Sequence, residues 1–299
     1  MTAEPEPDPA PSDPARAARA LWARFEPIHA VAYFADECER RYRDLGLKGF
    51  WMGYFASRSA PFGRCSPELA TATFFNFRPS MAERALPDAW SFAAPEAILE
   101  ARLLGSVAAL RAALGDRADG SDVGEAADLL EAAATAARTS SAGRPLFAAL
   151  SALPAPTGSL ERLWHAATLL REHRGDGHVV ASVAAGLDGL AAHVTFAATG
   201  AVPRARLQGA RGWTDEEWSA AEERLTASGW LHDGHLTDEG ARRRAEVEAA
   251  TDRLAAEPWV ALGPDAVHRL LDLLGPLAAQ VVASGAVPFP NPIGVPPPT

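Results

Sequence analysis

Residues 225–240 read LTASGWLHDGHLTDEG, and the turn signals in this stretch decide how the rest of the chain is interpreted. Gly229 is typical of a helix end, and Asp233-Gly234 between short apolar runs is typical of the turn of a two-stranded ribbon. Thr237, followed by two acidic residues, predicts the capped start of another helix. The sequence therefore predicts a helix, a small β wing and a second helix, in that order.

A weak internal repeat runs along the chain. The segment LGLKGF at 45–50 recurs as AGLDGL at 185–190, an offset of 140 residues, and Leu21-Trp22 recurs as Leu163-Trp164. Alanine-rich helices produce some similarity through composition alone, but these matches keep their order along the chain, as true repeats do. The sequence therefore predicts two duplicated halves.

The second half resembles the MarR family of winged-helix regulators. The resemblance rests on Gly186-Leu187 with the helix that follows, on Leu225 to Leu231, and on Leu236-Thr237 with Gly240. These segments have the order that they have in the family. The run HRGDGH at 173–178 also resembles a set of uncharacterised actinobacterial proteins, which implies no function.

The first half resembles the same family less completely. It has a similar start at 43–47, and Ser66 to Ala70 resembles the opening of the helix-turn-helix, but no wing can be recognised. The resemblance implies a mainly α fold with small β wings, in which tandem winged-helix halves are related by a pseudo-twofold axis. One polypeptide would then supply what MarR proteins form as a dimer.

Four segments are expected from this organisation. A disordered tail rich in Pro, Glu and Asp occupies 1–14, because such a composition cannot bury enough apolar surface to fold. A degenerate winged-helix half follows at 15–145, and a winged-helix half at 146–287. A Pro-rich strap occupies 288–299, where prolines prevent regular structure.

Composition limits the classes of partner. The chain has 299 residues, 48% of them apolar, and a net charge of −10 from 38 acidic and 28 basic residues. This charge disfavours nucleic acid as a partner without excluding it. No run approaches the roughly 20 apolar residues of a membrane helix, no signal peptide is recognised, and Cys38 and Cys65 form no metal or redox motif. We therefore expect a cytoplasmic protein, either a monomeric pseudo-dimer or a homodimer.

The helix expected to enter DNA in the second half is acidic. Residues 214–225 contain five carboxylates, against at most two nearby arginines, and acidic residues also have an ordinary role in the first turn of a helix. The counterpart at 78–86 is short and nearly neutral. The run Arg242 to Arg244 is interpreted as a solvated face. These features predict that DNA binding is lost.

Two polar stripes are expected to meet near the pseudo-twofold axis. Glu26, His29 and Tyr33 share one helical face, which we expect to continue to Asp36 and Glu37. His165, Thr168 and Glu172 share another face by the same spacing. In MarR proteins the first helices form the dimer interface and hold small ligands, so the resemblance implies a pocket between these stripes.

The densest group of ionisable residues is the run REHRGDGH at 171–178. Its two glycines are expected to break the helix, so that Asp176 caps a segment that restarts at His178. A histidine oriented by a carboxylate can transfer protons, and arginines can hold an anion. The candidate catalytic residues are His29, His165, Glu172, His173, Asp176 and His178. The candidate ligand-binding residues are Glu26, Tyr33, Arg58, Arg171 and Arg174.

Structural roles are alternatives for the same residues. Asp176 can be a plain helix cap, and His29 or His165 can be a hydrogen-bonded interior histidine. A metal or haem held by histidine is a weaker alternative, because HxxxH and HExxH are absent, and the aromatic residues Trp22, Phe50, Trp51 and Trp164 serve a core as well as a haem slot. No Walker loop, GxGxxG or GxSxG motif is present.

The leading hypothesis is a protein that binds a small organic molecule between its halves and either only holds it or converts it by acid-base catalysis. The alternative is a MarR-like, ligand-responsive transcriptional regulator. A third class, a scaffold that binds a protein through the helix at 214–225, has little support, because Trp213 and Trp218 do not share a helical face.

Overall fold

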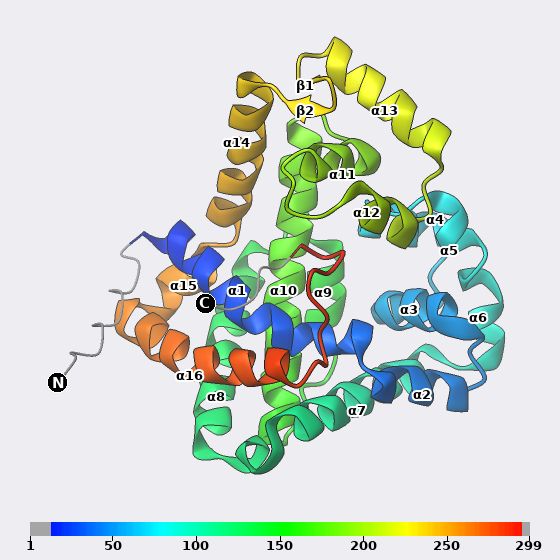
Figure 1. Cartoon of the computed structure of the whole chain (residues 1–299). Coiled ribbons are helices and arrows are strands. Elements are labelled where there is room, and N and C mark those ends of the chain that lie inside the picture. The colour runs from blue at the N-terminus through cyan, green and yellow to red at the C-terminus, as the bar shows by residue number, and fades with distance from the viewer. Residues whose placement is uncertain (1–12, 295–299) are drawn as a thin grey trace.

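The computed structural model describes residues 13–294, and its regular structure is mainly helical, as expected (Figure 1). The first half contains the helices α1 (Pro14–Phe34), α2 (Asp36–Asp44), α3 (Gly49–Ser59), α4 (Pro67–Phe74), α5 (Pro79–Glu83), α6 (Leu86–Phe92), α7 (Pro95–Leu114), α8 (Ser121–Ala137) and α9 (Pro145–Ser151). The second half contains α10 (Ser159–Ala184), α11 (Gly189–Ala197), α12 (Arg204–Arg211), α13 (Asp215–Ala227), the strands β1 (Leu231–His232) and β2 (His235–Leu236), α14 (Asp238–Leu254), α15 (Glu257–Leu262) and α16 (Pro264–Ala283). Short 3-10 turns lie at Ala60–Phe62, Gly115–Asp119 and Arg138–Ser140.

The wing predicted in the second half is confirmed. Strands β1 and β2 pair antiparallel, with Leu231 opposite Leu236, and Asp233 and Gly234 both have the positive φ that this turn requires. Thr237 accepts a hydrogen bond from Gly240 N at 2.9 Å and so caps α14. In the first half α6 and α7 are separated by two residues, so the described chain has one wing and the second expected wing is absent.

The core of the main bundle is organised by α10, which runs through the middle of the molecule (Figure 1). Helix α10 packs along α8, whereas α1 packs along α16, and α1 and α10 also contact each other. Leu21 and Phe25 of α1 and Leu163 of α10 are fully buried there. Burial of such side chains contributes about 1.5–3 kcal/mol each, so this crossing adds substantially to stability.

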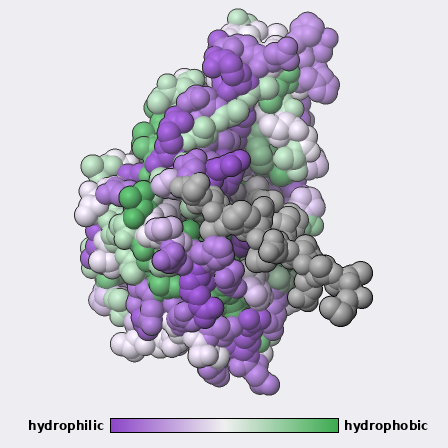
Figure 2. Space-filling view, turned by 90° about the vertical axis from the view of Figure 1, so that its left-hand side faces the viewer, coloured by the Kyte–Doolittle hydropathy of each residue, from purple (hydrophilic) through white to green (hydrophobic). Residues whose placement is uncertain are grey.

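A second, smaller core lies between α11, α12, α13, the wing and the end of α14 (Figure 1). Trp218 of α13 and Leu207 of α12 are buried at its centre. Thr214 and Glu217 form a reciprocal capping box at the start of α13, as the acidic first turn indicated. The upper end of the molecule, around the wing, is covered mainly by hydrophilic side chains (Figure 2).

The expected helix break at Gly175 and Gly177 is wrong, because α10 continues through both residues. A glycine inside a helix costs about 1 kcal/mol relative to alanine, but packing overrides this cost here. A Cβ on Gly177 would already lie 3.4 Å from Leu254 Cβ and 3.6 Å from an Arg144 guanidinium nitrogen. These are ordinary van der Waals distances, so α14 and Arg144 pack directly against α10 at Gly177.

Helix α1 differs from its expected limits at both ends. It begins at Pro14, where the Asp13 side chain accepts from Ala15 N at 3.0 Å, and it continues through Pro27. It ends at Phe34, and Ala35 is extended before α2 begins. The stripe of Glu26, His29 and Tyr33 therefore does not continue to Asp36 and Glu37, which lie on α2.

The two terminal segments are only partly described. Residues 1–12 of the expected disordered tail and residues 295–299 of the strap lie outside the described residues. Residues 288–294 contain no helix or strand and run from the end of α16 along the body toward α11 and α12 (Figure 1). Asn291 is buried, and Gly294 N donates to its side-chain oxygen at 3.0 Å.

Helix α16 has the length and apolar composition of a membrane-spanning helix. Its residues Leu270, Leu274, Leu277 and Val281 are buried, and it packs against α1, α7 and α8. This is the position of a core helix within the described fold.

Candidate functional site

A cavity of about 700 Å³ lies between the main bundle and the smaller core. Its wall is formed by residues of α1, α3, α9, α10, α11, α12, β2 and α14, by residues 73–77 and by residues 292–294 of the strap. The ionisable residues in the wall are Arg19, Arg58, Arg171, Arg174, Arg211, Arg244, Glu26, Glu172, Asp176, Glu248, His178 and His193. Arginines outnumber carboxylates in this wall, although the whole chain is acidic.

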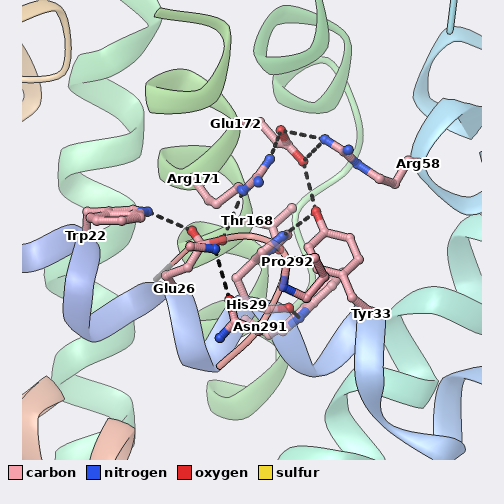
Figure 3. A network of polar contacts seen from close by, with 12 residues as sticks. Trp22, Glu26, His29, Tyr33, Arg58, Thr168, Arg171, Glu172, Asn291 and Pro292 are labelled. Atoms are coloured by element: carbon pink, nitrogen blue, oxygen red, sulfur yellow. Dashed lines mark hydrogen bonds and ion pairs between the residues drawn. The ribbon is translucent and has the colours of Figure 1, made fainter. Parts of the chain in front are cut away.

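Glu172 of α10 is the centre of a charged network in the wall (Figure 3). Arg58 Nη2 lies 3.2 Å from both carboxylate oxygens of Glu172, and Arg171 Nη1 lies 2.8 Å from Oε2. Burial alone would raise the pKa of Glu172, but the charges of Arg171 and Arg58 hold it well below its usual range. Glu172 is therefore a fully ionised, buried carboxylate.

Glu26 of α1 extends this network to the other side of the cavity. Arg171 Nε donates to Glu26 Oε1 at 3.2 Å, and Trp22 Nε1 donates to Oε2 at 3.0 Å (Figure 3). The two stripes predicted on α1 and α10 therefore meet, and Arg171 joins their carboxylates. The guanidinium of Arg58 also lies 4.2 Å from the centre of the Phe74 ring, so an aromatic side chain borders the network at Arg58.

His29 and Tyr33 lie behind this network and do not line the cavity. His29 Nε2 lies 2.8 Å from the Tyr33 hydroxyl, Nδ1 lies 2.9 Å from Thr168 Oγ1, and the Tyr33 hydroxyl donates to Glu172 Oε1 at 3.5 Å. Burial, with the charge of Arg171, lowers the pKa of His29 well below its usual value, so the ring is neutral. Burial raises the pKa of Tyr33 to about 12. Both side chains support Glu172 from the interior.

Asp176 and His173 point toward α9. Phe147 N in the first turn of α9 donates to Asp176 Oδ2 at 3.0 Å, so Asp176 caps α9 and the expected cap on a restarted α10 is wrong. Burial raises the pKa of Asp176 to about 6, although the Phe147 hydrogen bond lowers it. His173 Nε2 lies 3.0 Å from Ser140 Oγ, and burial lowers the pKa of His173 to about 3. Asp176 also lines the cavity, whereas His173 does not.

His178 and Arg174 line the cavity on the side of α14. His178 Nδ1 lies 2.9 Å from Thr251 Oγ1, and burial lowers the pKa of His178 to about 4. Arg174 lies 2.7 Å from Asp252 Oδ1, and its guanidinium lies 4.8 Å from the centre of the Trp22 ring. His178 is therefore a neutral imidazole in the cavity wall. Arg174 contributes a guanidinium that is paired with Asp252.

His165 is not brought to this site. It is absent from the cavity wall, and the charges that act on its pKa are those of Glu131, Arg138 and Arg102. Burial lowers the pKa of His165, and its Nε2 has no hydrogen-bond partner among the described residues. The spacing that placed His165 on the face of Thr168 was too coarse to separate it from the cavity side of α10.

Several residues of the cavity wall escaped the sequence reasoning, among them Arg244, His193 and Arg211. Arg244 is buried and pairs with Glu248 at 2.8 Å, so its interpretation as a solvated residue is wrong, whereas Arg242 is exposed and Arg243 is half-buried. His193 is a single histidine in the apolar helix α11, and Arg211 is the last residue of α12. Of these residues only His193 had a recognisable signal in the sequence, because it is a histidine between apolar residues.

The two helices that were expected to enter DNA, α5 and α13, touch each other where they begin. Arg78, just before α5, lies 2.9 Å from Glu217 Oε1 in the first turn of α13. Arg78 N donates to Arg211 O at 3.0 Å, and Trp213 Nε1 donates to Asn76 O at 2.9 Å. The turns before both helices are therefore joined by ion-pair and backbone contacts.

The described residues contain no group of three or more His, Cys, Asp or Glu that could hold a metal ion. The four aromatic residues considered for a haem slot do not line one space. Trp22 lines the cavity, Trp164 packs near His29, and Phe50 and Trp51 belong to an aromatic group around α3.

Comparison with known proteins identifies a family. A model of a helix-turn-helix family matches residues 18–288, which includes both halves of the chain. No curated protein and no solved structure matches.

Proposed function

The chain belongs to a helix-turn-helix family, and from this premise we propose that it binds a small organic molecule and no longer binds DNA. The observation that carries the proposal is the cavity of about 700 Å³. This volume lies within the range of about 300–1,000 Å³ that is usual for ligand pockets. A wall of buried ionisable groups and aromatic rings gives a ligand both an apolar surface and oriented polar contacts.

The proposal includes a pseudo-dimer of two MarR-like halves in one chain. It is supported by contacts between residues 139 positions apart, namely His29 with Thr168, Tyr33 with Glu172 and Arg78 with Glu217. Near a twofold axis a residue touches its own equivalent or a close neighbour of it, so contacts at separations close to the 140-residue repeat offset are what a duplicated chain would produce. The packing of α1 on α16 and of α10 on α8 also fits two halves that exchange their first helices.

The loss of DNA binding is supported by geometry and by charge. Helix-turn-helix dimers place their recognition helices about 34 Å apart, in successive turns of the major groove, and read bases with the N-terminal residues. Here the two N-terminal ends touch through Arg78 and Glu217. The exposed residues of α13 include Asp215, Glu216 and Glu223, which would repel phosphates.

Proton transfer in the cavity would fall to two of the predicted catalytic residues. Asp176 lines the cavity with a pKa of about 6, so its protonation changes near neutral pH. His178 lines it as a neutral imidazole, with a pKa of about 4. A carboxyl and an imidazole in these states can act as acid and base toward a bound molecule. Glu172, held ionised by two arginines, would orient the ligand.

Native and denaturing mass spectrometry of the purified protein tests the proposal. We expect a bound mass that disappears on denaturation. The variant Val179→Trp should lose this mass, because Val179 lines the cavity, and Val183→Trp on the exposed side of α10 should retain it. A bare wild-type chain, or equal retention by both variants, would argue against a ligand in the cavity.

A ligand-responsive transcriptional regulator is the second candidate, and membership of a helix-turn-helix family is the observation that favours it. Selection from random double-stranded DNA separates the two candidates. We expect no sequence to be enriched by the wild-type protein. Enrichment that is lost in Arg224→Glu, on the exposed face of α13, would favour the regulator instead.

A further inference from the structure

Arg211 at the end of α12 has an unusual environment in the cavity wall. It is 7% exposed, and its hydrogen bonds go only to backbone oxygens, from Nη1 to Ala210 at 3.3 Å and from Nη2 to Pro292 at 3.0 Å. Its Nε has no partner among residues 13–294. The guanidinium also lies 4.5 Å from the centre of the Phe77 ring. Arg211 is therefore held in place by carbonyl groups and a ring, without a counter-charge.

The other five arginines of the wall are each compensated by a carboxylate. The pairs are Arg19 with Asp252 and Glu248, Arg58 with Glu172, Arg171 with Glu26 and Glu172, Arg174 with Asp252, and Arg244 with Glu248. Within the described residues Arg211 has no such partner. Burial lowers the pKa of Arg211, and the charges of Arg58 and Arg171 lower it further. A buried cation without a counter-ion is costly, so this side chain is not explained by stability.

Two further unpartnered groups lie in the same wall. His193 Nε2 and Arg244 Nη1 are buried and have no hydrogen-bond partner among the described residues. Burial, followed by the charges of Arg211 and Arg244, lowers the pKa of His193 well below its usual value. His193 is therefore a neutral imidazole beside two guanidinium groups, and its Nε2 can carry a hydrogen to donate. Phe77 and Phe196 provide an apolar surface next to these donors.

We propose that Arg211, His193 and Arg244 form an oxyanion subsite that binds a carboxylate or phosphate group of the cavity's ligand. An oxyanion here would receive charge-assisted hydrogen bonds from donors that are otherwise unused. The apolar part of the ligand would lie against the phenylalanines. This inference rests on the proposed function and adds the chemical class of the ligand to it.

The first experiment compares three probes on the wild-type protein by isothermal titration calorimetry. They are 4-phenylbutyrate, phenyl phosphate and the uncharged 4-phenylbutyramide. We expect at least one of the anions to bind ten or more times as tightly as the amide, and the better anion identifies the preferred oxyanion. In Arg211→Gln this preference should fall below threefold. Arg206→Gln, an exposed arginine on the same helix, should retain it.

The second experiment needs no organic ligand. If Arg211 is an uncompensated cation, Arg211→Met should have a thermal midpoint no lower than that of the wild type. Sulfate at ten times its dissociation constant should raise the wild-type midpoint by about 3 °C and leave that of Arg211→Met unchanged. A variant that fails to fold would contradict the stability argument, and the wild-type probe comparison would still decide the subsite.

The outcomes separate the subsite from the proposed function. Equal binding of acid and amide overturns the subsite but leaves a ligand-binding cavity. Failure of both anions and of sulfate also overturns the subsite. A purified chain without a bound mass, together with no measurable binding of any of the three probes, counts against the proposed function itself.

Discussion

Removal of the charge of Glu172 should destabilise the protein strongly. Glu172→Gln keeps the size of the side chain but leaves Arg58 without any counter-charge and Arg171 with Glu26 alone. Breaking a buried ion pair on one side costs about 3–5 kcal/mol, and the retained amide oxygen favours the lower end. We therefore expect a loss of about 3 kcal/mol in the free energy of unfolding, or about 6 °C in the thermal midpoint.

Urea denaturation at pH 7 measures this effect, and a double-mutant cycle attributes it to the pair. Arg58→Met should also destabilise, but the double variant should lose less than the two single losses combined, with a coupling of about 2 kcal/mol. Glu223→Gln, an exposed residue on α13, should stay within about 0.5 kcal/mol of the wild type.

The pH dependence of the same variant gives an independent check. The pKa of Glu172 is depressed in the folded state, so its stabilisation is present above the ordinary glutamate range of about 4.3 and is lost as the pH falls below it. The difference between wild type and Glu172→Gln should therefore shrink below pH 4. A variant as stable as the wild type at pH 7 would refute the assignment of Glu172 as the centre of the network.

Three other predictions concern single positions. Folding raises the pKa of Asp176 from 3.8 to about 6, so its contribution to stability is present below pH 4 and is lost as the pH rises through 6. Asp176→Asn should therefore be more stable than the wild type at pH 8, by about 3 kcal/mol at most. The denaturation midpoints of the two proteins should converge at pH 4. A Cβ on Gly189 would clash with the carbonyl oxygen of Phe75, so Gly189→Ala should cost at least about 1–3 kcal/mol in urea denaturation, whereas Gly209→Ala, where a Cβ meets nothing, should not destabilise. Truncation after residue 287 removes a segment of the cavity wall and should speed the release of any bound probe in stopped-flow measurements, and unchanged release would show that the strap does not limit access.

Local signals were sufficient to predict the wing and its flanking helices. The Asp233-Gly234 turn, the Thr237 cap and the glycine after α13 all act within a few residues, so they can be recognised without tertiary structure. The polar stripes on α1 and α10 were also recoverable, because helical periodicity places Glu26, His29 and Tyr33 on one face.

The remaining differences come from packing between distant segments. Gly175 and Gly177 look like helix breakers locally, but α10 is packed against α8, α14 and α1 and continues through both residues. Arg244 belongs to a run of three arginines, and only the docking of α14 determines that it turns inward.

Arg211 has no sequence pattern of its own, and the sequence marks His193 only as a histidine between apolar residues, so the importance of both comes from the partners they lack. A missing partner can be recognised only in three dimensions, after every neighbouring carboxylate has been placed. The cavity wall was therefore predicted on the side of α10 and missed on the side of α11 and α12.

The contacts of His29 with Thr168 and of Tyr33 with Glu172 have a consequence for how such a chain can evolve. In a homodimer, a residue on the symmetry axis faces an identical copy of itself, so any mutation there occurs twice. In the duplicated chain that we propose, the facing positions are encoded separately, so a tyrosine can face a glutamate and a histidine a threonine. On this proposal the interface at the crossing of α1 and α10 can diverge one residue at a time, and one ligand site per chain, which binds without cooperativity, can replace the two coupled sites of a homodimer.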